Sequence, residues 1–373
     1  MIAGSDRELK MLDKASAEFA RKELASARQE NDAYPFAPFF DGILKKAYDL
    51  DFFHVTLPET SGGIGQGIAA LCVILYNLCR EDSSLGGILF TNAAAQELLI
   101  AAQADELLAS ITQSPESIPE FLIAVPIFNN PSDISNAAMA VKQNGGYQLS
   151  GRVAYVAAGS ISRHAVIPAE IDGGNNYSLF LIDLSSDRVS ISEPIHSLGL
   201  HACPAVDITL DQAPGRLLGE SGRGPVYFEK MTDRMSAAAA AMSAGIMAGS
   251  FKEALAYSRG RFQGGREIVN WSEMRMILSD MAVKVKTAEG TVSRVCQAVD
   301  AQEAGWQTYA RAAAIDIQKN ACDLTTDGIQ VLGGVGYMKD FGQEKRYRDA
   351  KHVQALLGMV PMKKLRFIGR IID

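Results

Sequence analysis

The stretch Gln330-Val331-Leu332-Gly333-Gly334-Val335-Gly336-Tyr337 places three glycines within four positions, between two helical patterns. The residues before it, Ala310–Ile329, are rich in alanine, and the residues after it carry lysine and arginine. Glycines let a backbone approach a flat or charged ligand closely because they lack a Cβ atom. A helix that begins beside such a turn also presents unpaired N–H groups to an anion. A tight helix–helix connection explains this stretch equally well, so the rest of the chain decides.

Length and composition exclude several classes of protein. A chain of 373 residues predicts two or three domains, and 47% hydrophobic with 21% charged residues is typical of a soluble globular protein. The net charge of -7 gives no reason to expect a nucleic-acid partner, and no apolar run is long enough for a membrane span. The five cysteines are scattered and odd in number, which favours reduced thiols over disulfides or a metal site. We therefore expect a cytoplasmic protein without a metal.

Helical spacing dominates the beginning of the chain. Apolar residues recur at helical intervals over Asp6–Gln29, Asp41–Tyr48, Ile68–Arg80 and Ala93–Ile111. The polar group 81–84 separates the last two of these segments. This pattern predicts an N-terminal helical domain over residues 1–118.

The pattern changes to a β type over residues 119–215. Phe121–Phe128 is an apolar run, and alternation follows at 147–151, 153–156, 164–170, 177–183, 189–191 and 205–210. Turn-forming residues bound these segments, as in a small β-barrel or sandwich.

Helical spacing then returns over residues 216–373, in four segments: Met231–Tyr257, Trp271–Gln297, Trp306–Ile329 and His352–Ile371. The expected fold is mainly α, with a central β domain and a C-terminal four-helix bundle.

Local motifs in this three-part order resemble the acyl-CoA dehydrogenase family over essentially the whole chain. They are Leu57-Pro58-Glu59 with Gly62, Gly63 and Gly65; Arg80, Asp82 and Ser84; Gly146-Tyr147-x-Leu149-x-Gly151; Leu198–Cys203; Leu217–Glu220; Arg234, Arg259 and Phe262; and Gln330–Tyr337 with Arg348-Asp349-Ala350-Lys351. The most specific of them is Gln330–Tyr337 together with Arg348-Asp349-Ala350-Lys351. No single motif is decisive, but their order across three domains predicts the fold.

The resemblance implies FAD as cofactor and an acyl-CoA thioester as substrate. In this family the flavin takes a hydride from Cβ while a carboxylate takes the Cα proton. The implied cofactor contacts are Arg259 at the pyrophosphate, Phe262 beside it, and Gln330, Gly333, Gly334 and Gly336 towards the FAD of a neighbouring subunit. The family also implies a tetramer that passes electrons to an electron-transfer flavoprotein.

The segments that flank the flavin ring in the family depart from its pattern. Tyr155 stands where the family has Trp and can still stack on a ring, but Ala157 replaces a threonine and offers no hydroxyl to the flavin. Ser132 and Asp133 match the end of a family loop and are implied to contact the pyrophosphate or the pantetheine. A simple Asx-type turn explains these two residues equally well.

The position of the catalytic base departs most from the family pattern. Many members have a glutamate after Arg-Asp-Ala-Lys, but that position is Leu357 here, and only its backbone N–H remains for a thioester carbonyl. A subset of the family carries its glutamate just before the arginine matched by Arg234, a residue implied to lie on the substrate side. That position is Asp233. Asp233 is thus the candidate base, although a pair with Arg234 or Lys230, or a place in the first turn of a helix, accounts for it almost as well.

Three functions remain open at this point. The first is an FAD-dependent acyl-CoA dehydrogenase that uses Asp233 as base. The second is a catalytically silent subunit that completes the FAD site of a paralogue in a hetero-oligomer. The third is an enzyme that keeps the flavin but catalyses a different reaction, such as an elimination without an electron acceptor. His352, close to Leu357 in the sequence, is a further possible proton acceptor, although a structural histidine is the simpler interpretation.

Overall fold

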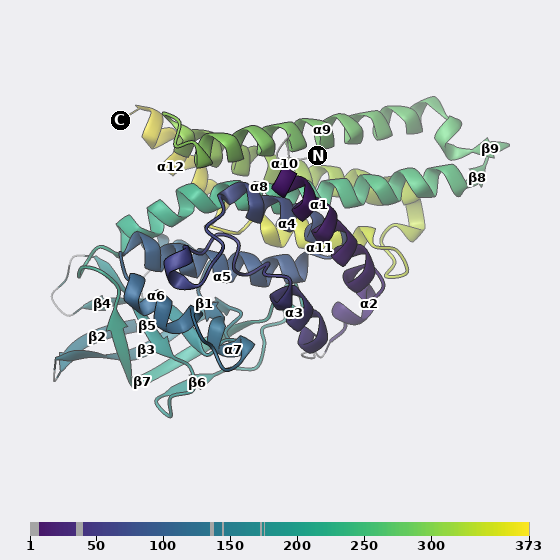
Figure 1. The fold of residues 1–373 in the computed structure, drawn as a ribbon. Coiled ribbons are helices and arrows are strands. Elements are labelled where there is room, and N and C mark those ends of the chain that lie inside the picture. Colours follow the sequence, from purple (N-terminus) through teal and green to yellow (C-terminus); the bar gives the residue numbers. More distant parts are fainter. Residues whose placement is uncertain are drawn as a thin grey trace.

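A computed structural model describes residues 7–34, 40–134, 138–143, 145–171, 174 and 176–372. Figure 1 shows three parts: helices from the N-terminal third, a group of β-strands, and a layer of long helices from the C-terminal third. This is the predicted order of helical, β and helical parts. No helix among the described residues is both long and apolar enough to cross a membrane.

The N-terminal part is helical, with bounds that differ from the prediction. The first predicted helix is divided into α1 (Arg7–Phe19), a π-helical segment (Ala20–Leu24) and α2 (Arg28–Asn31). The helices that follow are α3 (Phe40–Asp49), α4 (Ile68–Glu81), α5 (Ser83–Ala101) and α6 (Asp105–Thr112). The predicted helix start at Ala93 is wrong, because Asp82 caps α5 by accepting a hydrogen bond from the backbone N–H of Ser84 at 2.8 Å. α5 is buried along nearly its whole length, which its uniformly apolar and small residues permit.

The β part closes into a small barrel. Its strands are β1 (Ile123–Ala124), β2 (Ala138–Gln143), β3 (Gly146–Ala157), β4 (His164–Ile171), β5 (Tyr177–Asp183), β6 (Val189–Ile191) and β7 (Ala205–Leu217). The pairings run β4–β2–β3–β7–β5, and β5 pairs β4 again, so the ring is complete. The predicted strand Phe121–Phe128 is wrong: α7 (Ile118–Phe121) occupies its start, and Pro126, which has no N–H, follows the two-residue β1. β7 continues two residues past the predicted end of this domain.

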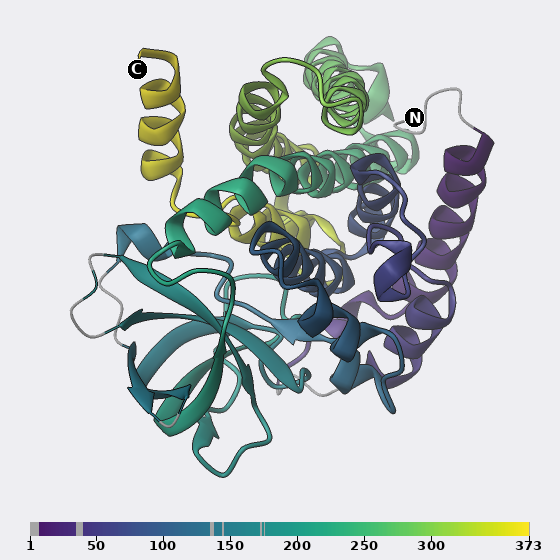
Figure 2. The ribbon, with the colours of Figure 1, turned by 60° about the vertical axis from the view of Figure 1, so that its left-hand side comes forward.

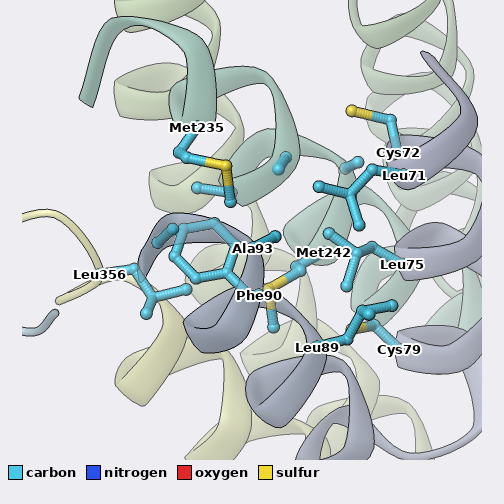
Figure 3. Packing of buried hydrophobic residues seen from close by; sticks show 14 of the residues in the cluster. Leu71, Cys72, Leu75, Cys79, Leu89, Phe90, Ala93, Met235, Met242 and Leu356 are labelled. Atoms are coloured by element: carbon cyan, nitrogen blue, oxygen red, sulfur yellow. The ribbon is translucent and has the colours of Figure 1, made fainter. Parts of the chain in front are cut away.

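The C-terminal part is a bundle of α8 (Gly224–Gly260), α9 (Ser272–Asp300), α10 (Trp306–Leu332) and α11 (Gln343–Val353). A two-stranded hairpin, β8 (Phe262–Gln263) with β9 (Arg266–Glu267), joins α8 to α9. α8 also packs against α4 and α5, which joins the two helical parts. Figure 3 shows this junction, where Phe90 and Met242 meet Leu356 from the segment that follows α11.

The predicted helix His352–Ile371 is wrong. α11 ends at Val353, and a separate α12 (Val360–Ile372) begins after a turn in which Leu357 and Gly358 have φ angles of 67° and 117°. These left-handed conformations end a helix. Leu357 therefore lies in a turn between two helices. Figure 2 shows α12 at the edge of the molecule, and its contacts within the bundle include α10.

Candidate functional site

The glycine stretch lines an open pocket of about 760 Å³. One wall is the end of α10, with Gln330, Gly333 and Gly334. The opposite wall comes from the end of α8 and the β8–β9 hairpin, with residues that include Arg261 and Trp271. The pocket therefore joins two segments that the sequence resemblance assigned separately to FAD binding.

The other predicted cofactor residues lie outside this wall. Arg259 is exposed near the end of α8, and Phe262 is 64% exposed on the hairpin. Gly336 packs against its own chain, because a Cβ atom there would lie 2.3 Å from the carbonyl oxygen of Ile329. Gly336 thus shapes the turn, whereas Gly334 has open space where a side chain would begin.

Two pocket residues were missed from the sequence. Arg261 lines the pocket two residues beyond Arg259, and Trp271 lies against the hairpin with the Arg266 guanidinium 3.8 Å from its ring centroid. The helix that begins at the pocket is α9, whose first residues line it. A basic residue directly after the end of α8, followed by Gly264-Gly265, was the available signal.

Asp233 lies buried in the third turn of α8 and is paired with two arginines. Its Oδ1 accepts from Nε of Arg311 at 2.6 Å and from Arg370 at 2.7 Å, and its Oδ2 accepts from Arg370 at 3.3 Å. Both expected structural partners, Arg234 and Lys230, are therefore wrong, as is the place in the first turn of the helix. Both carboxylate oxygens face guanidinium donors.

Leu357 is buried, and its backbone N–H donates to the carbonyl oxygen of Ile127 at 2.9 Å. The N–H that the sequence left for a thioester carbonyl is thus used within the chain. Leu357 and Arg311 also share a small cavity of about 20 Å³ with Thr232, Ser236 and Lys363. Arg311, which holds Asp233, therefore also lies beside Leu357, at a place with almost no free volume.

Three aromatic side chains close the space beside Leu357. Phe128 packs edge-on against Tyr155 at 5.4 Å between ring centroids and lies 4.5 Å from the His352 ring. His352 Nδ1 lies 2.6 Å from the carbonyl oxygen of Gly199 and must donate to it, so Nε2 accepts from the Tyr155 hydroxyl at 3.0 Å. This is a neutral imidazole, and burial lowers the pKa of His352 accordingly.

Ser132 and Asp133 form a turn that faces α12. The Asn130 side chain accepts from the Ser132 backbone N–H at 2.9 Å, which is the Asx-type turn considered from the sequence. The Asp133 carboxylate accepts from both terminal nitrogens of Arg366, one of them at 2.8 Å. Asp133 is thus paired within the chain.

Arg234 pairs with a carboxylate of α5. Its Nε donates to Glu97 at 2.8 Å, and the two side chains are 26% and 11% exposed. Burial raises the pKa of Glu97 even though Arg234 opposes this shift. The arginine, which was predicted to lie on the substrate side, therefore joins α8 to α5.

A second polar cluster joins the N-terminal part to the β barrel and α11. His201 Nε2 lies 2.8 Å from the carbonyl oxygen of Ser197, and its Nδ1 lies 2.9 Å from the Asp32 carboxylate. Both neighbours are acceptors, so this geometry favours the cationic imidazole, which donates from both ring nitrogens. Arg348 also donates to Asp32. Among the described residues, no group of three or more His, Cys, Asp or Glu side chains could hold a metal.

Comparison with known proteins gives two matching family models. Residues 6–109 match the acyl-CoA dehydrogenase N-terminal domain, and residues 222–368 match the acyl-CoA dehydrogenase C-terminal domain. Cyclohexane-1-carbonyl-CoA dehydrogenase from Geobacter metallireducens is 26% identical, over 99% of this chain and 98% of that protein. The caffeyl-CoA reductase–Etf complex subunit CarC from Acetobacterium woodii is 25% identical, over 97% and 98%.

Solved structures share the fold. Butyryl-CoA dehydrogenase from Megasphaera elsdenii superimposes with a TM-score of 0.87 at 19% identity, over 98% of both chains. Acyl-CoA dehydrogenase complexed with FAD from Bacillus anthracis gives 0.88 at 20% identity, over 99% of this chain and 67% of that one. The relatives named are dehydrogenases and a reductase, which are oxidoreductases of CH–CH bonds. With two family models that together span most of its length, this chain belongs to the acyl-CoA dehydrogenase family.

Proposed function

We propose that this chain works in an FAD-dependent acyl-CoA dehydrogenase as the subunit that completes the FAD site of a paralogous subunit. The observation that carries the proposal is the contrast between two places in the molecule. The pocket at Gln330, Gly333 and Gly334 is open, with about 760 Å³ of space. The space beside Leu357, where the family places the flavin ring and the base, is filled by the chain itself.

The open pocket fits the distal part of FAD. Gly334 leaves room for close approach of a ligand, and Gln330 offers an amide with both donor and acceptor atoms. Arg261 on the facing wall supplies a planar set of donors suited to a pyrophosphate, and Arg259 lies two residues before it. These residues would hold the adenosine and pyrophosphate end of an FAD whose ring lies on the partner. When bound, FAD supplies the acceptor for the hydride.

The ring of FAD does not fit between Tyr155 and Leu357 as these segments stand. A planar ring system placed there would have to separate Phe128, Tyr155 and His352, and break the bond from Leu357 N–H to the Ile127 carbonyl. It would also gain no hydroxyl from Ala157, whose N–H is already donated to Val125. No catalytic step is therefore assigned to the ring side of this chain.

The second candidate function is a self-sufficient dehydrogenase with Asp233 as base. It is favoured by one observation, the position of Arg311. That arginine holds Asp233 and also lines the small cavity beside Leu357, so it links the two base positions of the family. For Asp233 to take a proton, Arg311 and Arg370 would have to release its oxygens. Under either function we expect a soluble assembly, tetrameric by family resemblance, with electron-transfer flavoprotein as the electron acceptor.

Flavin content of the purified protein separates the two functions. The chain is expressed alone and together with a paralogous acyl-CoA dehydrogenase subunit, and FAD per polypeptide is measured from the visible spectrum. The proposal expects a colourless chain when alone, and a yellow hetero-oligomer with about one FAD for every two polypeptides. One FAD per polypeptide in the chain alone, bleached by an acyl-CoA, would establish the second candidate instead.

A further inference from the structure

The C-terminal helix α12 has its polar and apolar faces reversed. Surface helices normally bury an apolar stripe and expose charge. No residue of α12 is buried, and Leu365, Ile368, Ile371 and Ile372 are between 46% and 73% exposed. The charged residues Lys363, Arg366 and Arg370 point inward instead, to partners on other elements. Polar contacts, and not apolar burial, therefore hold this helix in place.

These contacts converge on three carboxylates, two of which belong to α8 and one to the β part. Arg366 pairs with Asp133 of the β part, while Arg370 pairs with Glu229 at 3.0 Å and with Asp233 at 2.7 Å, both on α8. Arg311 of α10 completes the group through its bonds to Glu229 at 2.7 Å and to Asp233. We call this group of three carboxylates and three arginines the clasp.

Lys363 holds the N-terminal end of the same helix in place. Its Nζ lies within 2.7 to 3.0 Å of three oxygens: the side chain of Gln318 and the carbonyls of Gln354 and Leu356. It thereby fills the wall of the small cavity that Leu357 shares with Arg311. α12 thus closes that cavity at one end and covers Asp233 at the other.

We infer that α12 is a strap, which the clasp holds over Asp233 and which opens and exposes Asp233 when the ion pairs to Arg366 and Arg370 are removed. The inference rests on the family assignment only for the identity of the covered residue, and otherwise on the clasp. Arg366 and Arg370 are 23% and 31% exposed in their side chains, so salt reaches both pairs.

The test measures exposure of Asp233 and mobility of α12 in the full chain, without flavin, substrate or turnover. The double variant Arg366→Ala/Arg370→Ala is compared with the wild type by hydrogen exchange over residues 360–372. Carbodiimide labelling of Asp233, located by mass spectrometry, is measured in parallel. We expect at least tenfold faster exchange in the variant and labelling of Asp233 that the wild type lacks. Arg163→Ala, which removes an exposed arginine paired with Glu120 and Asp183, is the matched control and should change neither readout.

Two further measurements keep the test decisive if the variant folds poorly. Arg366→Lys/Arg370→Lys keeps both charges and should restore most of the protection. In the wild type, raising the salt concentration from 0.05 M to about 1 M should speed exchange in α12 more than in α11, because salt screens the exposed pairs. Equal exchange and equal Asp233 labelling in the wild type and the alanine variant would overturn the strap. Because neither readout involves FAD, failure here leaves the proposed function untouched, and colour in the chain alone leaves the strap untouched.

Discussion

Arg311 donates from Nε to Asp233 at 2.6 Å, and both side chains are nearly excluded from solvent, at 7% and 13% exposure. A buried charge is costly unless a partner of opposite charge stays in place. The pair therefore decides what Asp233 can do. As long as Arg311 holds it, the aspartate stabilises the junction of α8 and α10 and is not available to a substrate.

Asp233→Asn should destabilise the chain by about 3 kcal/mol, because the neutral amide leaves Arg311 with reduced compensation in a buried place. Urea unfolding followed by circular dichroism measures the change. The control is Asp323→Asn, which removes an exposed pair with Lys319 and should alter stability by less than about 0.5 kcal/mol. Unchanged stability of Asp233→Asn, with loss of flavin bleaching by acyl-CoA, would favour the role of base over the structural role.

Leu357→Glu should fail to create a dehydrogenase. The side chain at this position is 3% exposed, and the cavity beside it holds about 20 Å³, so a glutamate has neither water nor free volume. We expect a loss of stability of about 3 kcal/mol or more from a buried carboxylate, or the protonation of that carboxylate. Thermal unfolding and acyl-CoA-dependent flavin reduction measure the two effects. Leu357→Met keeps the apolar volume and should cost less than about 1.5 kcal/mol.

Gly334→Ala should weaken FAD binding while leaving the fold intact. A Cβ atom at Gly334 meets no atom of the chain within 4 Å, so the added methyl group projects into the space that the proposal gives to the cofactor. FAD retained per hetero-oligomer after gel filtration should fall several-fold. Gly290→Ala also adds a methyl group to open space, in the middle of α9, and serves as the matched control. Equal FAD content in the two variants would remove the glycine turn from the cofactor site.

The sequence predicted the order of the parts because period and turn residues report locally on helix and strand. Gln330, Gly333 and Gly334, which the resemblance assigned to FAD binding, line one pocket, and their contact with a cofactor stays a prediction. The sequence could not predict the partners of Asp233, because Arg311 and Arg370 lie 78 and 137 residues away along the chain. Ion pairing of this kind depends on how helices pack and leaves no periodic signal in the sequence.

The break between α11 and α12 was missed for a related reason. Residues 352–371 keep enough apolar spacing to imitate one helix, although Gly358 and Pro361 interrupt that spacing. The left-handed φ angle at Leu357 is held by packing and by the bond to Ile127, which are both tertiary contacts. The sequence could therefore have placed a break near Gly358 and Pro361, but not the left-handed conformation of Leu357.

His201 should make stability fall as pH rises through neutrality. Burial opposes its protonation, but the hydrogen bonds and charge of Asp32 outweigh burial, so the pKa of His201 is raised above its ordinary value of 6.5. A group whose pKa is raised by folding binds its proton more tightly in the folded state. Its contribution is complete below pH 6.5 and is lost as pH rises through the folded pKa.

The measurement is the free energy of unfolding in urea at pH 6, 7, 8 and 9 for the wild type and for His201→Gln. Glutamine keeps a donor for the Ser197 carbonyl but does not titrate, so we expect a decline with pH in the wild type and a flatter curve in the variant. Arg348 also contacts Asp32 and stays charged throughout, so the carboxylate remains paired and the loss should be about 1 kcal/mol, not global unfolding. Parallel curves for both proteins would mean that His201 is neutral in the folded state and that its two acceptor contacts are not both hydrogen bonds.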